Sequence, residues 1–299
     1  MTTAAGTASR APEPARTRPS ASRWAQRLLF VGLFVYFLLP MIAVLIYSVA
    51  TRWTAHILPD GYTLGWWGQV FSDPRVLGAF GSTLILATLT AVLDIALVVP
   101  AAYWARVRNP RIRTFIELAA AIPFALPYLV IGFALLQFSG VVAPGLQGTF
   151  PLLVLGHAAI AFPFLYWAVD GAMAAAGIER LSEAAETCGA SPLQIVRRVV
   201  LPNITPGIVS GALLAFATSF GEFAMVQTIA RGVYTIPIWS AEALRSYSGE
   251  PGSFNRLAVV TTISFIVLFM LSAIVVYWNR GQTVRLLPGA RAIEQREGV

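Results

Sequence analysis

Two carboxylates lie inside long apolar stretches of this sequence, where an ionisable side chain is uncommon. Asp94 falls midway along one stretch, and Glu222 falls toward the end of another. A central Asp costs roughly 2.5 to 3.5 kcal/mol in a membrane helix, so Asp94 should face protein or water rather than lipid. Its carboxylate then either bonds to a neighbouring helix or attracts a cation that crosses the membrane.

Glu222 has a less regular setting. A glycine, Gly221, precedes it, and the other flanking residues are Ser219, Phe220 and Phe223. This combination indicates a locally loosened helix beside a cavity, because irregular backbone at membrane depth needs cover from protein or water. Glu222 is therefore a candidate gate residue or a candidate substrate contact, with plain packing as the third interpretation.

The sequence offers few ligands for a metal ion. Its two histidines, His56 and His157, are far apart, and Cys188 is the single cysteine. One cysteine excludes an internal disulfide and a multi-cysteine zinc site. No HExxH or GxSxG pattern occurs, so an intramembrane enzyme is a remote alternative that would require Asp94 and Asp170 to meet. We expect this chain to bind no metal and no cofactor.

The elements that position these residues must be membrane helices. Of the 299 residues, 57% are hydrophobic and only 12% are charged, whereas soluble domains carry about 25% charged residues. Six stretches are long and apolar enough to span a bilayer, which takes about 20 helical residues. We therefore predict an all-α membrane protein with six spans, at residues 24–50, 79–104, 114–138, 150–171, 205–229 and 256–278.

The basic residues, all of them arginine, predict an orientation. With the N-terminus in the cytoplasm, 16 of the 21 arginines fall in cytoplasmic tails and loops, and five fall in outer segments. This asymmetry predicts a multi-pass protein of a bacterial inner membrane with both termini cytoplasmic. The net charge of +7 could indicate nucleic acid as a partner. The arginines cluster at the ends of spans, however, which argues against it.

The domain organisation follows from composition. Residues 1–20 are rich in Ala, Thr, Ser, Pro and Arg, with almost no large apolar side chain, so we expect a disordered tail. The membrane domain is expected at 21–280, followed by a cytoplasmic tail at 281–299.

The cytoplasmic loop at 177–204 has the pattern of two amphipathic helices. Ile178, Leu181, Ala185 and Cys188 recur at helical spacing, as do Leu193, Val196 and Val200. Gly189 is placed to end the first helix in the left-handed conformation. Ser191, Pro192 and Gln194 form a capping box with proline at the first helical position, and Pro202 is expected to end the second helix. Amphipathicity alone favours a helix lying on lipid or packing against the spans.

The residues of this loop resemble a known motif. Glu183-Ala184-Ala185 is followed after three residues by Gly189 and after nine more by Val199-Val200-Leu201-Pro202. This arrangement resembles the EAA loop of ABC importer permeases, which has Glu-Ala-Ala, a glycine six residues after the Glu, and Ile-x-Leu-Pro. The one departure is Val199 in place of Ile. Leu155-Gly156-His157 and Pro163-Phe164 also resemble this family, and the likeness covers roughly residues 79–278.

The resemblance implies a type I ABC importer permease fold with a cytoplasmic coupling helix-turn-helix. Glu183, Ala184, Ala185, Gly189, Leu201 and Pro202 would then couple the spans to a dimer of ATPase subunits. Glu183 would pair with a basic group on the ATPase. A phosphate-binding loop requires lysine, and this sequence has none, so ATP and Mg²⁺ are expected on those separate subunits. The permease itself would be non-catalytic. A channel or structural anchor would not explain the coupling motif.

The resemblance also implies further partners and a group of substrates. An extracytoplasmic binding protein would deliver the solute, and a second permease would complete the path, with a heteromeric pair favoured over a homodimer. The segment Ser219-Phe220-Gly221-Glu222-Phe223 resembles permeases of the spermidine/putrescine type and their relatives for ferric iron, thiamine or phosphonate. Sugar permeases more often have Trp-Asn-Glu-Phe here. We expect a polyamine-type permease, with the other cargoes as alternatives.

Overall fold

The computed structural model describes residues 20–53, 56–229, 232–245 and 252–283, and nearly all of them are helical. In chain order the helices are α1 (Ser20–Val49), α2 (Gly65–Ser72), α3 (Pro74–Tyr103), the π-helical turn η1 (Trp104–Arg108), α4 (Pro110–Ala125), α5 (Tyr128–Val142), the 3₁₀ turn η2 (Pro144–Leu146), α6 (Phe150–Ala176), α7 (Ile178–Thr187), α8 (Pro192–Ile195), the π-helical turn η3 (Val196–Val200), α9 (Leu201–Gly221), α10 (Ala224–Ile229), α11 (Ile236–Arg245) and α12 (Ser253–Thr283).

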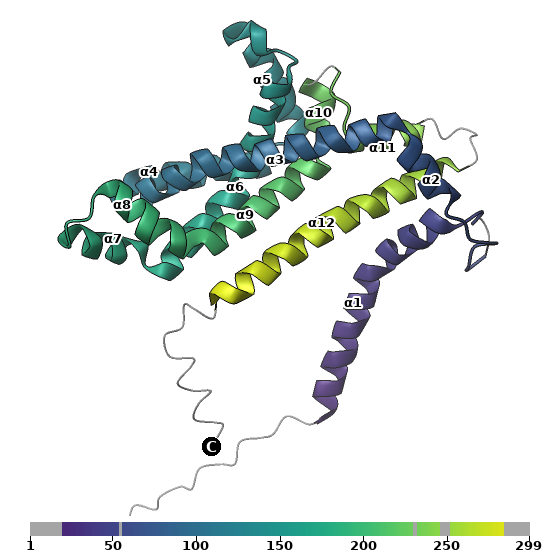
Figure 1. The fold of residues 1–299 in the computed structure, drawn as a ribbon, viewed down its shortest axis with the longest axis horizontal. Helices are drawn as coiled ribbons and strands as arrows, with labels where there is room; N and C mark the ends of the chain where they lie inside the picture. The colour runs from purple at the N-terminus through teal and green to yellow at the C-terminus, as the bar shows by residue number, and fades with distance from the viewer. Residues whose placement is uncertain (1–19, 54–55, 230–231, 246–251, 284–299) are drawn as a thin grey trace, which may run out of the picture.

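Connecting segments lie at two opposite ends of the helical body, and α5 and α10 project from its side between these ends (Figure 1). One end holds α7 and α8, next to the ends of α4, α6 and α9; we call it the coupling end. The other end holds α2 and α11, and we call it the outer end. The long helices run alternately from one end to the other, as the predicted six-span topology requires (Figure 1). Within the described residues, five helices and one bent pair are long and apolar enough to cross a membrane.

The centre of the fold is a close packing of α3, α6 and α9. Two glycines of α9 permit this approach. A Cβ atom on Gly207 would lie 2.5 Å from the Cβ of Ala172, and one on Gly211 would lie 2.9 Å from the Cα of Leu165. Such distances are too short for real carbon atoms. The close contact between α9 and α6 therefore depends on these two small residues.

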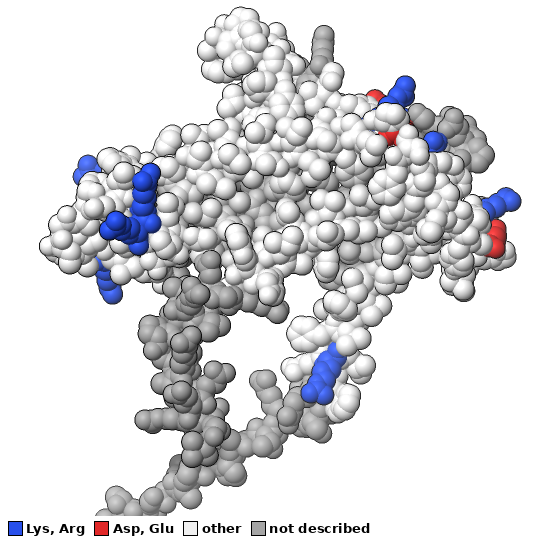
Figure 2. Space-filling model, in the orientation of Figure 1, with Lys and Arg blue, Asp and Glu red and all other residues white. Residues whose placement is uncertain are grey.

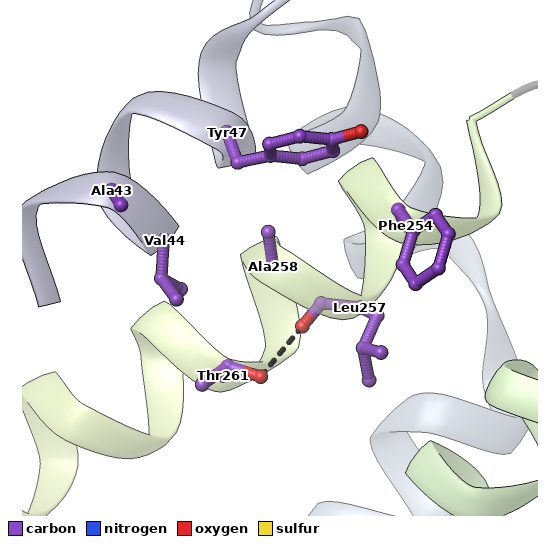
Figure 3. A pocket seen from close by; sticks show the side chains of 7 residues that line it. All are labelled: Ala43, Val44, Tyr47, Phe254, Leu257, Ala258 and Thr261. Carbon is purple, nitrogen blue, oxygen red and sulfur yellow. Dashed lines mark hydrogen bonds between the residues drawn. The ribbon is translucent and has the colours of Figure 1, made fainter. Parts of the chain in front are cut away.

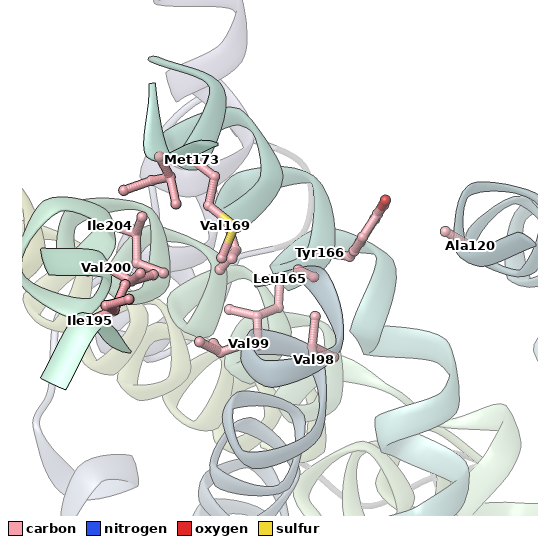
Figure 4. Close-up of a cluster of buried hydrophobic side chains, with 12 residues drawn as sticks. Val98, Val99, Ala120, Leu165, Tyr166, Val169, Met173, Ile195, Val200 and Ile204 are labelled. Carbon is pink, nitrogen blue, oxygen red and sulfur yellow. The ribbon is translucent and has the colours of Figure 1, made fainter. Parts of the chain in front are cut away.

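A hydrophobic cluster at the coupling end joins the loop helices to the spans (Figure 4). Ile195 and Val200 from the loop insert beside Ile204 of α9, and all three side chains are at most 1% exposed. They pack with Val98 and Val99 of α3 and with α6 residues Leu165, Tyr166, Val169 and Met173. The loop is thus built into the core and does not lie free on the membrane surface.

Helix α1 stands apart from the other spans and contacts mainly α12 (Figure 1). None of its most apolar window is buried. Its last turn is fixed at the outer end, where Asn255 Nδ2 donates to the carbonyl oxygens of Tyr47 and Ala50, at 2.9 and 2.8 Å. Trp66 Nε1 donates to the same Ala50 carbonyl oxygen at 2.9 Å.

A groove of about 440 Å³ separates α1 from α12 (Figure 3). Its walls include Val44, Leu257 and Ala258, and the Thr261 hydroxyl donates to the Leu257 carbonyl oxygen at 2.8 Å. The groove presents no charged side chain, so it has the character of a lipid-facing gap and does not suit a polar solute.

The third predicted span is not continuous, which corrects the prediction for residues 114–138. Helices α4 and α5 meet at an angle of 111°. The break follows from Pro127: the preceding residue, Leu126, is extended, with φ −119° and ψ 140°, as residues before proline tend to be. Pro100, Pro123 and Pro163 lie inside helices, whereas Pro127 interrupts its span.

The fifth predicted span, 205–229, also has different limits. Its helix begins at Pro192 as a continuation of the loop and ends at Gly221. Residues 222 and 223 are not helical, and α10 forms a separate short helix. The loosened backbone predicted around Gly221 is thus confirmed as a full break. Most of the predicted tails, 1–19 and 284–299, lies outside the described residues.

Candidate functional site

The turn between α7 and α8 has the geometry that the sequence predicts. Gly189 adopts φ +78°, the left-handed conformation that favours glycine. Ser191 caps α8 by accepting from the Gln194 backbone N–H at 3.4 Å, and Gln194 Oε1 accepts from the Ser191 N–H at 2.8 Å. Both hydrogen bonds of the capping box are present, with Pro192 at the first helical position.

The prediction that Pro202 ends the second helix is wrong. The chain continues from α8 through the π-helical turn η3 into α9. Proline is tolerated in the first turn of a helix, and Pro202 is the second residue of α9. In η3 the Leu201 N–H donates to the carbonyl oxygen of Val196, and Asn203 Nδ2 donates to Val199 O at 2.7 Å. The loop therefore continues directly into α9.

The predicted apolar stripes are only partly buried. Ile178 is fully buried and Ala185 packs against the cluster at the coupling end, but Leu181 is 39% exposed and Cys188 is exposed. Ser182 takes the buried position next to Ile178 instead. In the second helix Val200 is buried and Leu193 is 60% exposed. The reason is that α7 turns only one narrow face to the spans.

The other face of α7 is open to a partner. Glu183, Ala184 and Gly189 are all exposed, and nothing in the described part of the chain pairs with the Glu183 carboxylate. Leu181 and Leu193 add exposed apolar surface. We call these five residues the coupling face. Arginine side chains surround this end of the molecule (Figure 2). Leu201 and Pro202 lie behind the coupling face, half-buried and exposed respectively, where η3 enters α9.

A chain of buried polar groups crosses the centre of the fold. The imidazole Nδ1 of His157 on α6 is 2.8 Å from Ser219 Oγ on α9, and that hydroxyl bonds to Thr90 Oγ1 on α3 at 3.2 Å. The imidazole Nε2 lies 3.8 Å from Glu222 Oε2. We call these four residues the polar chain. Ser219 and Glu222 were predicted from the sequence as candidate path residues. Their contacts with Thr90 and His157 were not predicted.

Glu222 holds the break between α9 and α10. Its Oε1 accepts from the Ala224 N–H at 2.9 Å, and its Oε2 accepts from the Met225 N–H at 2.8 Å. The side chain is 5% exposed. A carboxylate that accepts from the first N–H groups of a helix satisfies donors that have no partner within the helix.

The remaining candidates of the translocation path are not members of the polar chain. Asp94 is 1% exposed, its Oδ2 has no hydrogen-bond partner, and it lines a mainly apolar cavity of about 370 Å³ between α3, α4 and α6. Phe220 stacks on Phe216 and packs in the core. Phe223 is one of the residues that line a cavity at the outer end.

That outer cavity has a volume of about 290 Å³ and polar walls, unlike the cavity at Asp94. Tyr234 and Glu242 line it, and the Tyr234 hydroxyl donates to Glu242 Oε2 at 2.5 Å. Desolvation, together with this hydrogen bond, raises the pKa of Tyr234 to about 12. Arg245 provides a positive charge at the same cavity.

Ser219, His157 and Glu222 are the residue types of a hydrolytic triad, but their setting does not suit hydrolysis. Ser219 is 2% exposed and His157 is fully buried. Neither residue lines any of the cavities described above. Asp94 and Asp170 do not meet either, because Asp170 is held by arginines at the coupling end. Among the described residues there is no group of three or more potential metal ligands.

Comparison with known proteins gives this arrangement a family. Residues 98–281 match the model of the family described as "Binding-protein-dependent transport system inner membrane component". The chain belongs to this family of ABC importer permeases. The matched region contains the coupling loop, α9 and nearly all of α12. Permeases of this family are non-catalytic membrane subunits.

Relatives of this chain in the family are named for different substrates. A probable molybdenum ABC transporter permease of Haloferax volcanii is 31% identical over 75% of this chain and 80% of its own length. The sulfate transport system permease of Salmonella typhimurium is 28% identical over 83% and 89% of the two chains. The putrescine transport system permease of Escherichia coli K12 is 27% identical over 84% and 92%.

Solved structures show the same fold, that of type I ABC importer permeases. A chain of a bacterial ABC transporter involved in alginate import superposes with a TM-score of 0.67 at 18% identity, covering 89% of this chain and 99% of that one. A chain of the MetNI methionine transporter gives a TM-score of 0.54 at 20% identity, over 69% and 94% of the two chains.

Proposed function

We propose that this permease forms the path for a small solute that an extracytoplasmic binding protein delivers, and that separate ATPase subunits drive it by docking on the coupling face. The main support for this proposal is that α7 is buried on one side and exposed on the other. One side of the helix is built into the core through Ile178 and Ala185, while Glu183 and Ala184 point outward without a partner in the described chain. A rigid element with one open face suits transmission between subunits.

Substitutions on the coupling face test this proposal. Glu183→Arg replaces an exposed acid within a regular helix, so the spans should remain folded while a basic partner is repelled. Gly189→Arg adds bulk but also places a side chain at φ +78°, so it can disturb the turn itself. Gly145→Arg is the matched control, because Gly145 is exposed within η2, away from the coupling face, and a Cβ there meets nothing within 4 Å.

The readouts are co-purification with the ATPase subunit and transport in reconstituted vesicles. We expect Glu183→Arg to lose transport, with folding as in the wild type, and Gly145→Arg to transport normally. Normal transport by both coupling-face variants, with the ATPase still bound, would show that α7 is not the coupling element.

For the cargo we propose a polyamine-type solute. The segment from Ser219 to Phe223 and the putrescine relative support it, and the buried Asp94 favours a cation over an anion. An oxyanion is the second candidate, because the molybdenum and sulfate relatives match this chain at similar identity. Thermal-shift screening of the cognate binding protein with putrescine, molybdate and sulfate separates the two.

We further propose a heteromeric pair of permeases in a bacterial inner membrane, with the coupling end and both termini in the cytoplasm. The arginines around the coupling end support this orientation (Figure 2). The exposed apolar surface of α1 supports a second membrane subunit, because lone membrane helices gain stability by packing.

A further inference from the structure

Ion pairs join α7 to the ends of α3 and α6. Arg106, in η1, lies 2.9 Å from Asp170 Oδ1 on α6 through Nη2, and its Nε donates to the same oxygen at 2.9 Å. Its Nη1 reaches Glu179 Oε1 on α7 at 2.7 Å. One guanidinium therefore bridges three elements: the end of the α3 span, α6 and the coupling helix.

A second ion pair holds the other end of α7. Arg108 Nη2, also in η1, lies 2.5 Å from Glu186 Oε1. Glu179 and Glu186 are seven residues apart, which is about two helical turns, so they lie on the same side of α7. Helix α7 is thus attached to η1 at two points. Glu183 falls between these points and stays free for a partner.

The two pairs differ in burial. Both carboxylates of α7, Glu179 and Glu186, are 41% exposed, so the difference lies in their partners: the Arg106 side chain is 7% exposed and also holds Asp170, which is 15% exposed, whereas Arg108 is 35% exposed. Exposed ion pairs hold their partners weakly, but a buried guanidinium that loses its carboxylates is left without compensation. Arg106 is therefore the principal link, and its planar donor groups can serve two carboxylates at once.

The backbone around α7 is also unusual. Helix α7 contacts two π-helical turns, η1 before α4 and η3 before α9. π-helical turns are rare and occur frequently at functional sites. Helix α7 follows α6 directly at Gly177, and its contacts with η1 and η3 place a non-standard turn between α7 and each of α4 and α9.

We propose that Arg106 is a positioning residue that makes α7, α3 and α6 move as one unit, so that displacement of the coupling face reaches the spans. This proposal rests on the proposed function, in which an ATPase displaces α7. Without the pairs of Arg106 and Arg108, α7 would keep its packing at Ile178 but could tilt relative to η1.

The test uses the complete transporter in vesicles, with transported solute and hydrolysed ATP measured on the same sample. The main variant is the double substitution Glu179→Gln and Glu186→Gln, which releases α7 and leaves Arg106 paired with Asp170. Arg106→Gln removes the principal link itself. Glu242→Gln is the matched control, because Glu242 bonds to Tyr234 at the outer end and does not belong to this ion-pair network.

We expect the ATPase subunit to co-purify with the double variant and with Arg106→Gln, and ATP hydrolysis to continue. Transport per ATP should fall by roughly tenfold, within the range that substitutions in a coupling network produce. The control should match the wild type. If the double variant transports as much solute per ATP as the wild type, the proposal is overturned. Failure of the ATPase to bind the wild-type permease would instead refute the proposed function.

Discussion

At the scale of single residues, Glu222 caps the start of α10. Both of its oxygens are engaged by N–H groups at the start of α10, and its neighbour His157 lies just beyond hydrogen-bond distance. The His157 Nε2 atom is buried and has no hydrogen-bond partner in the described structure, and Glu222 Oε2 lies 3.8 Å from it. Glu222 is therefore placed to hold the break between α9 and α10 in a fixed geometry.

Glu222→Gln tests this role. Glutamine has only one acceptor oxygen, so one backbone N–H of α10 loses its partner, which costs about 0.5 to 2 kcal/mol for a helix cap. We expect a lower unfolding temperature of the purified complex and an altered basal ATPase rate without substrate. Glu242→Gln, on an exposed carboxylate at the outer end, is the control. A changed transport affinity with normal basal ATPase activity would instead make Glu222 a substrate contact.

Local features of the site were predictable from the sequence, whereas contacts between distant residues were not. The left-handed Gly189 and the capping box of Ser191 were predictable, because each depends on neighbours within a few positions. The polar chain was not, because Thr90 and Ser219 are 129 residues apart in sequence. A buried histidine in an apolar span, His157, is the signal that could have indicated such a partner.

At the scale of elements, the packing of α6 against α9 sets how the coupling loop connects to the membrane. The two helices approach through Gly207 and Gly211, and η3 continues into α9 without a break. The sequence predicted that Pro202 ends the second loop helix. That prediction was wrong, because proline in the first turn of a helix need not end the preceding one.

Gly207→Leu should separate α6 from α9. Its Cβ would lie 2.7 Å from the Ala168 carbonyl oxygen, which is backbone and cannot move aside cheaply. We expect a loss of roughly 1 to 3 kcal/mol of stability, typical of overpacking, measured as a lower unfolding temperature in detergent. Gly171→Leu is the control on α6, because nothing lies within 4 Å of a Cβ there. Equal stability of both variants would contradict the close contact.

At the scale of the whole molecule, the helices run between an outer end and a coupling end, and we propose that the coupling end binds an ATPase in the cytoplasm. The helix order supports the division, and the arginine asymmetry supports the orientation. Six spans were predictable from hydrophobicity. The 111° bend between α4 and α5 was not, because Pro127 lies in a stretch that is apolar on both sides of it.

The most direct test of the account is the labelling of Cys188, the single cysteine, which is exposed beside the coupling face. A membrane-impermeant maleimide is applied to inside-out and right-side-out vesicles, with and without the ATPase subunit. We predict labelling only in inside-out vesicles, and slower labelling when the ATPase is bound. A variant with Cys188→Ser and Ile57→Cys, where Ile57 is 94% exposed in the segment between α1 and α2, should be labelled only from outside and unaffected by the ATPase. Labelling of Cys188 from outside, or at an unchanged rate with the ATPase bound, would contradict the account.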